Sequence, residues 1–167
     1  MTEAPATCPT CGRSLDLHNR HIRYRLPDPV LQLAEADRTA RSWGNDLLLQ
    51  VQDVGAFVRA LLPIRLTGGY SVTFGVWLGV HPDELKIAWN VWEKPDYRDL
   101  TLDGRLANAI PPWGMSLFGS PAGARVINPD HVPYITSSTS PELTRVLESE
   151  WPHDPILSAI DSTIGNG

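Results

Sequence analysis

The sequence predicts an α+β fold, in which a mainly antiparallel sheet from the middle of the chain is packed by helices from both ends. Two observations carry this prediction. Segments with the two-residue alternation of half-buried strands lie between residues 47 and 136, and helix start signals lie near both ends of the chain. Strands gathered in the middle, rather than alternating with helices, favour antiparallel pairing.

Length and composition limit the architecture. The chain has 167 residues, of which 42% are hydrophobic, so one domain of ordinary size can bury its own core. Its 15 prolines and 13 glycines predict many turns and short elements. We therefore expect a single domain over residues 1–167. Residues 1–25 form a cysteine knuckle and a basic arm, and residues 26–167 form the α+β body.

The first element of the body is expected to be a helix. Asp28 can serve as its N-cap with Pro29 at the first helical position, and Gly44 marks its expected end. Two extended segments follow, at residues 47–52 and 57–66.

The clearest strand spans residues 71–80. Its even-numbered residues are all apolar and predict one buried face. On the other face Trp77 stands between two glycines, which leave room for another element, and we expect that element to be a helix. The preceding Thr67-Gly68-Gly69-Tyr70 segment predicts a hairpin, because glycines supply the positive φ that tight turns require.

A second helix is predicted to begin at His81-Pro82, and its apolar residues include Trp89 and Trp92 at the spacing of a buried stripe. We therefore interpret these two tryptophans as core residues. After a polar connection, further short strands are expected at residues 105–110, 113–118, 124–127 and 132–136. C-terminal helices are expected to start at Ser140-Pro141 and Asp154-Pro155.

Charge and cysteine content limit the partners and the compartment. The formal net charge is −5 and the sequence pI is about 5.4, so nucleic acid and anionic membranes are repelled on average. The first seven residues lack the basic start and apolar run of a secretory signal, and no stretch of eighteen apolar residues exists. With only two cysteines as well, we expect a cytoplasmic protein without a membrane span.

The most chemically specific feature is the Cys8-Pro9-Thr10-Cys11-Gly12 knuckle. A turn here aims both sulfurs at one point, which suits tetrahedral zinc. The nearest candidates for the remaining ligands are two histidines, so the predicted cofactor is Zn²⁺ and the predicted set is Cys8, Cys11, His18 and His21. The gap between Cys11 and His18 is shorter than the roughly twelve residues of the usual zinc finger.

Two other interpretations of the knuckle stay open. It can be a remnant turn that has lost its other ligands, or it can be a reversible thiol pair. The redox interpretation has a specific weakness, because redox Cys-x-x-Cys pairs follow a strand and begin a helix. Here no strand is expected before Cys8, and Pro9 and Gly12 favour a turn.

Two further features point to partners. The Arg13–Arg25 stretch gives local positive charge that can contact phosphates, although the acidic overall charge favours a solvated arm or an internal partner for the acidic C-terminus. Trp113 and Trp151 stand beside prolines or charges and are expected to be partly exposed. Because exposed aromatic residues are favoured at protein interfaces, we predict an interaction role for these two residues.

The sequence lacks the common catalytic motifs, including Gly-x-Ser-x-Gly, the P-loop and Gly-x-Gly-x-x-Gly. The leading hypothesis is therefore a non-enzymatic protein-interaction or regulatory domain, of which immunity proteins are one type, with a structural zinc knuckle. One alternative is a thiol-redox or other enzyme that uses Cys8 and Cys11. The second is nucleic-acid binding through the Arg13–Arg25 stretch.

Five segments carry a family resemblance: the knuckle, Phe57-Val58-Arg59-Ala60, Phe74-Gly75-Val76-Trp77-Leu78, Gly104-Arg105-Leu106-Ala107-Asn108, and the region from His131 to Trp151. In this order they resemble the uncharacterised bacterial family called domain of unknown function 2199. The resemblance implies a bacterial cytosolic protein with the knuckle joined to an α+β body, and it implies no particular activity. It also implies a histidine shortly after the knuckle glycine. This chain has Ser14, Leu15 and Asp16 there, which leaves the third metal ligand open.

Overall fold

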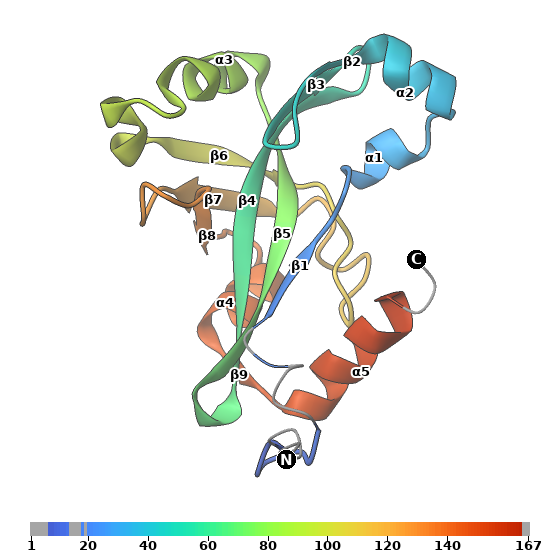
Figure 1. The fold of residues 1–167 in the computed structure, drawn as a ribbon, viewed down its shortest axis with the longest axis vertical. Coiled ribbons are helices and arrows are strands. Elements are labelled where there is room, and N and C mark those ends of the chain that lie inside the picture. The colour runs from blue at the N-terminus through green and yellow to red at the C-terminus, as the bar shows by residue number, and fades with distance from the viewer. Residues whose placement is uncertain (1–6, 14–17, 19, 165–167) are drawn as a thin grey trace, which may run out of the picture.

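In the part of the chain that the structure describes, five strands form a closed ring at the centre of the molecule (Figure 1). The computed structural model describes residues 7–13, 18 and 20–164. Successive strands of the ring pair antiparallel, and the last pairs in parallel with the first, which closes a barrel. The ring consists of β4 (Gly55–Leu66), β5 (Tyr70–Val80), β6 (Thr101–Leu106), β7 (Pro121–Arg125) and β8 (Tyr134–Ser137).

This closure corrects the expected arrangement. The combination of helices with mainly antiparallel strands is confirmed, but the sheet closes on itself instead of remaining a layer packed by helices. Long strands accumulate twist, which favours closure. Small residues then allow close approach: a Cβ at Gly104 of β6 would lie 2.2 Å from the carbonyl oxygen of Gly79 in β5.

The remaining described strands extend the barrel strands on their outer sides. β1 (Arg20–Arg23) runs parallel to β5, so the predicted basic arm contributes a strand. β3 (Leu48–Val51) pairs antiparallel with β4, and β2 (Ser42–Gly44) pairs with β3. β9 (Glu150–Trp151) runs parallel to the end of β4.

The hairpin between β4 and β5 confirms the strongest sequence prediction. The two strands pair continuously from Ala56 with Val80 to Leu66 with Tyr70. The turn η2 (Thr67–Gly69) connects them, and its two glycines have φ values of 80° and 84°. Only glycine adopts such values without strain, which is why this segment turns.

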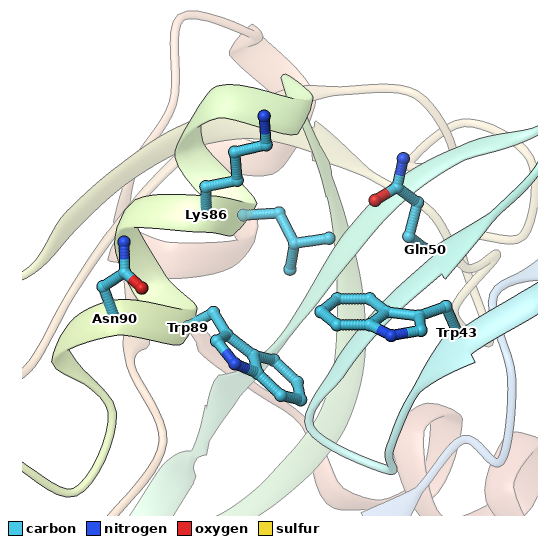
Figure 2. A pocket seen from close by; sticks show the side chains of 6 residues that line it. Trp43, Gln50, Lys86, Trp89 and Asn90 are labelled. Atoms are coloured by element: carbon cyan, nitrogen blue, oxygen red, sulfur yellow. The ribbon is translucent and has the colours of Figure 1, made fainter.

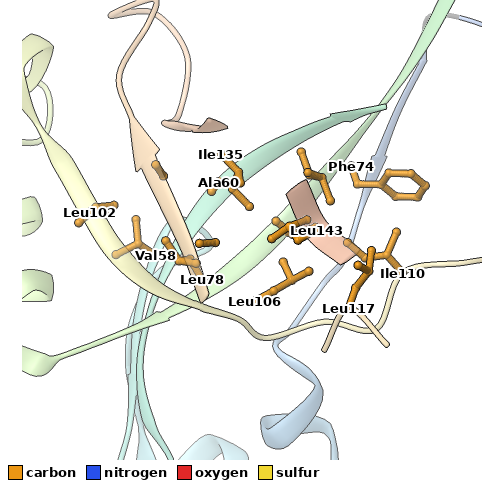
Figure 3. Close-up of a cluster of buried hydrophobic side chains, with 14 of the residues drawn as sticks. Val58, Ala60, Phe74, Leu78, Leu102, Leu106, Ile110, Leu117, Ile135 and Leu143 are labelled. Carbon is orange, nitrogen blue, oxygen red and sulfur yellow. The ribbon is translucent and has the colours of Figure 1, made fainter. Parts of the chain in front are cut away.

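The main hydrophobic core fills the barrel and continues beneath the C-terminal helices (Figure 3). The even-numbered residues of β5 from Val72 to Leu78 are buried in it, as their alternation predicts. Leu143 of α4 (Pro141–Glu148) belongs to this core together with Ile110 and Leu117. The core also includes buried residues of α5 (His153–Ile164), namely Ile156, Leu157 and Ile160.

The opposite face of β5 forms a smaller core around Trp77, which is fully buried. Val30 of α1 (Asp28–Leu31) packs there, so a helix does approach this face. The space beside the flanking glycines, however, is taken by strands. A Cβ at Gly75 would contact the Arg23 side chain of β1 at 3.5 Å.

The N-terminal helix differs from its prediction. Instead of one helix there are two, α1 and α2 (Glu35–Arg41). Asp28 does not cap α1, whose N-cap is Pro27. Its carboxylate instead accepts hydrogen bonds from Asn108 Nδ2 at 3.0 Å and from the Ala109 amide at 2.6 Å. Asp28 therefore hydrogen-bonds with residues distant in the sequence instead of capping its own helix, as the local pattern predicts.

The middle of the chain contains the predicted helix, α3 (Pro82–Val91), and the short turn η3 (Pro95–Asp99). The strand predicted at residues 105–110 begins earlier, because β6 occupies Thr101–Leu106. The strand predicted at residues 113–118 is wrong, since that segment folds as successive turns. No helix in the described chain is long and apolar enough to cross a membrane.

Candidate metal centre

Both ends of the described chain meet in one cluster of metal-binding side chains. Cys8, Cys11, His18 and His153 each offer one ligand atom, and these four atoms lie within 4.8 Å of one another. The first three residues come from the predicted knuckle region, and His153 is the first residue of α5. Cys8, His18 and His153 are buried, with exposed fractions of 2%, 4% and 2%. The cluster is thus closed and could hold a metal ion.

Three of the separations within the cluster match the edges of a zinc tetrahedron. Cys8 Sγ lies 3.5 Å from His153 Nδ1, and Cys11 Sγ lies 3.5 Å from His18 Nε2. The two histidine nitrogens are 3.1 Å apart. Zn–S bonds of about 2.3 Å and Zn–N bonds of about 2.0–2.1 Å give tetrahedral edges of roughly 3.5 Å and 3.3 Å. One ion can therefore reach all four atoms with little movement.

The turn of the knuckle is held by its own backbone. The Gly12 amide donates to the Cys8 carbonyl at 2.8 Å, and the Cys8 amide donates to the Arg13 carbonyl at 2.8 Å. Burial, the largest single effect, raises the pKa of the Cys8 thiol, but hydrogen bonds from the backbone of Cys11 and Thr10, a hydrogen bond with the Cys11 side chain and the charge of His153 together lower it by more. The net result is a pKa lowered from 9.0 to about 7. The turn therefore favours the thiolate, which is the form that binds metal.

His153 is oriented by a second hydrogen bond. Its Nε2 donates to the Thr67 carbonyl in the β4–β5 turn at 2.7 Å. In the neutral ring this leaves the lone pair on Nδ1, the nitrogen that faces the cluster. A histidine ligand that donates its other N–H to a carbonyl is the usual arrangement around protein-bound metals.

Neighbouring contacts hold the knuckle against the rest of the fold. The Tyr70 ring lies 4.9 Å from the His18 ring and 5.4 Å from the His153 ring, centroid to centroid. Arg13 forms a salt bridge with Asp154 at 3.4 Å and donates to Ser158 Oγ at 2.7 Å. The first turns of α5 are therefore bound by a knuckle cation as well as by the cluster.

His21 does not join the cluster that the spacing predicted. It lies within β1 opposite Thr73, its side chain is exposed, and it lines a different pocket. The extended backbone of β1 carries it away from the cysteines, whereas His18 precedes the strand. His153 takes the fourth position. Sequence reasoning missed it because 145 residues separate it from Cys8, and no local spacing rule spans that distance.

The predicted interaction residues pack against each other. The Trp113 and Trp151 rings meet edge to face with centroids 5.0 Å apart, and both are half-buried against the main core. Trp151 Nε1 also donates to the Val146 carbonyl at 3.2 Å. Both indoles are therefore partly exposed, as expected, and their interaction role stays a prediction.

Other indoles are the exposed ones. Trp89 of α3, predicted as core, is 40% exposed, and Trp43 of β2 is 54% exposed. Their rings lie side by side with centroids 4.5 Å apart, at one wall of a pocket between α3 and the β2–β3 strands (Figure 2). The helical spacing is correct: Leu85 and Ala88 are buried and Trp92 packs half-buried against the main core, but Trp89 does not.

The basic stretch does not form one continuous patch in the described residues. Arg13 is bound to α5, as described above. Arg23 donates to the Asp46 carbonyl at 3.3 Å, and Arg25 lines a separate pocket beside α2. The side chain of Arg20, which also belongs to the predicted basic stretch, lies outside the part of the chain that the structure describes.

The sequence matches the family described as "Uncharacterized protein conserved in bacteria (DUF2199)" over residues 7–145. The match covers most of the chain, so the protein belongs to this family. The matched segment includes Cys8, Cys11 and His18, and it ends before His153. No curated protein and no solved structure gave a significant match.

Proposed function

We propose that the protein is a barrel domain stabilised by one structural zinc ion, which is bound by Cys8, Cys11, His18 and His153. The observation that carries this proposal is the orientation of His153. Its Nε2–H is committed to the Thr67 carbonyl, so its Nδ1 lone pair points at two sulfurs and a second imidazole nitrogen. A cation satisfies these four donors together.

The donor set selects zinc and a structural role. Two thiolates with two imidazoles in a tetrahedron suit zinc, whereas magnesium and calcium take oxygen ligands. Catalytic zinc keeps a coordination position for water, but here four protein side chains would occupy all four positions of a tetrahedron. The same geometry weighs against the thiol-redox alternative, because zinc-bound thiolates are not available for exchange with a disulfide.

Metal analysis tests the proposal. Protein purified without an affinity tag should contain one equivalent of zinc by inductively coupled plasma mass spectrometry. Cobalt substitution should give the absorption of a tetrahedral site with thiolate ligands. Cys8→Ser and His153→Gln should each weaken zinc retention by at least about tenfold, because each removes one of four ligands.

His21→Gln is the matched control, because His21 is a histidine from the same segment that lies outside the cluster. This variant should retain zinc like the parent protein. Zinc loss in His21→Gln with retention in His153→Gln would refute the proposed ligand set. Metal-free parent protein whose thiols remain fully reactive toward alkylating agents would refute the metal site itself.

A second function, protein contact, is favoured by the exposed pair of Trp43 and Trp89 (Figure 2). Their pocket has a volume of about 330 Å³, and buried Leu85 contributes to its lining. Among the described residues, Lys86 is the only charged one that lines it, and it forms no salt bridge with any of them. We infer that the occupant is a partner segment with an apolar side chain for the pocket and a neighbouring carboxylate for Lys86.

Peptide display tests this second function. Selection of a random peptide library on the zinc-loaded protein should enrich sequences with an apolar residue next to Asp or Glu. Trp89→Ala should weaken their binding by at least about tenfold, because truncating a buried interface indole costs more than 1 kcal/mol. Ile127→Ala is the control, since Ile127 is 58% exposed but lies outside the pocket lining. Equal binding to the two variants would exclude this surface.

A further inference from the structure

The outer face of the β4–β5 hairpin contains a buried arginine that lacks an anionic partner. Arg59 of β4 is only 3% exposed, and its guanidinium carbon lies 4.1 Å from the centroid of the Trp77 ring. Among the residues that the structure describes, no carboxylate forms a salt bridge with Arg59. A buried charge without a counter-ion is costly, so the site favours an anion from outside the chain.

Backbone carbonyls engage only part of this guanidinium. Nε donates to the Asp46 carbonyl at 3.1 Å, and Nη1 donates to the carbonyls of Gly75, at 3.0 Å, and Tyr24. An arginine carries five N–H groups in a fork that matches a carboxylate. The N–H groups on Nη2 make no hydrogen bond with any described residue, so this edge remains for a ligand.

Arg59 lines a pocket with a volume of about 230 Å³. The lining combines basic side chains with an apolar wall, and its residues include Arg59, Arg23, His21, Leu47, Leu61 and Val132. A pocket of this kind, apolar with a few polar groups that converge, is the usual form of a small-molecule site. Its limited size admits only a small ligand or the end of a chain.

A second cation stands beside Arg59. Arg23 Nη2 donates to the Asp46 carbonyl at 3.3 Å, the same oxygen that accepts from Arg59 Nε. Burial first, and the charge of Arg23 second, lower the pKa of Arg59 to about 10, while the Asp46 carboxylate opposes this effect. Two guanidinium groups that converge on one carbonyl form a local positive centre in an acidic protein.

We propose that this pocket binds a carboxylate that carries a small apolar body. Arg59 and Arg23 bind the carboxylate, while Leu47, Leu61 and Val132 contact the apolar body. The same chemistry is offered by a free small carboxylic acid and by the C-terminus of a peptide that ends in an apolar residue. The site lies on β1 and the outer face of the hairpin and contains none of the proposed zinc ligands, so it stands independently of the metal.

Calorimetric titration of the zinc-loaded protein tests the proposal. The probes are 4-methylpentanoate, its neutral amide, and a short peptide ending in leucine with either a free or an amidated C-terminus. The free carboxylate should bind and the neutral amide should not. Binding of 4-methylpentanoate alone identifies a small acid as the ligand, and stronger binding of the free-ended peptide identifies a chain terminus. No binding of any carboxylate up to about 10 mM would overturn the proposal.

Variants locate the binding in this pocket. Arg59→Lys keeps the charge but loses the fork, so affinity should fall at least about tenfold. Because Arg59 also binds three backbone carbonyls, this variant can misfold, and two others avoid that problem. Arg23→Gln should weaken binding roughly threefold to tenfold, and Val132→Phe should abolish it by filling the pocket.

Arg38→Gln is the matched control, because it removes a half-buried arginine of α2 that does not line this pocket. It should bind the carboxylate like the parent protein. Parental affinity in both Arg23→Gln and Val132→Phe, or equal affinity of the parent for the acid and its amide, would show that the pocket is not a carboxylate site.

Discussion

Asn108 shows how a single polar side chain orders three segments of the fold. It is completely buried, and its Oδ1 accepts from the Trp77 amide at 2.8 Å. Its Nδ2 donates to the Leu26 carbonyl at 3.0 Å and to Asp28 Oδ1 at 3.0 Å. The amide thus connects β5 to the segment that leads into α1. A buried polar group of this kind stabilises a fold only while all its partners are satisfied.

Asn108→Ala is expected to destabilise the protein by about 2–4 kcal/mol, because the Trp77 amide and the Leu26 carbonyl lose their partner in a buried site. Urea unfolding followed by fluorescence measures the change in the free energy of unfolding. Asn90→Ala, at an exposed position of α3, is the control and should be neutral or slightly stabilising, since alanine is the better helix former. An equal effect of the two substitutions would contradict the role of Asn108.

Ligand residues illustrate what spacing can and cannot predict. The knuckle and His18 are recognisable because they lie within eleven positions of one another and use residue types that bind zinc. His21 has the same residue type and a similar spacing, and only the extended backbone of β1 excludes it. His153 is invisible to spacing rules, because its position depends on how α5 returns to the β4–β5 turn.

Individual elements were predictable where their pattern is local. β4 and β5 follow from alternation and from the glycines between them, and α3, α4 and α5 follow from proline at or near the first turn. The barrel did not follow, because its closing contact pairs Leu61 of β4 with Tyr134 of β8. Such a non-local pairing leaves no periodic signal in either segment.

Errors at the element scale have tertiary causes. The residues at 113–118 have the apolar content of a strand, yet Leu117 is drawn into the core within a series of turns. Trp89 has the spacing of a core residue, yet its only ring neighbour among the described residues is Trp43 of β2, and it stays 40% exposed. In both segments the apolar residue types were identified correctly, but the sequence does not show which other elements pack against them.

At the scale of the whole molecule, the knuckle connects the two ends of the described chain. His153, beside the knuckle cysteines, binds the turn between β4 and β5 at Thr67, and Arg13, the residue after the knuckle, binds the side of α5. A cross-link removes more conformational entropy from the unfolded chain when the loop that it closes is longer. Because the cluster joins residues 145 positions apart, a metal ion there restricts nearly the whole chain.

Zinc removal should therefore loosen both ends of the chain while the barrel persists. The barrel core, with fully buried Val72, Phe74 and Val76, contains no proposed ligand and should therefore keep its strand pairing. Treatment with a strong chelator should lower the melting temperature by at least about 5 °C, because loss of a ligand that binds only the folded state destabilises it.

Hydrogen exchange measured by mass spectrometry shows which segments are destabilised when zinc is removed. Protection should fall in residues 7–13 and in the first turns of α5, and it should remain in β4 and β5, since their amides are paired within the barrel. Re-addition of zinc should restore it, and the Cys8→Ser, Cys11→Ser double variant should behave like the chelated protein in either buffer. Uniform loss of protection would show that the ion holds the barrel itself together. Unchanged exchange at both ends would show that the cluster does not contribute to stability, because an ion bound between the knuckle and α5 cannot leave without freeing them.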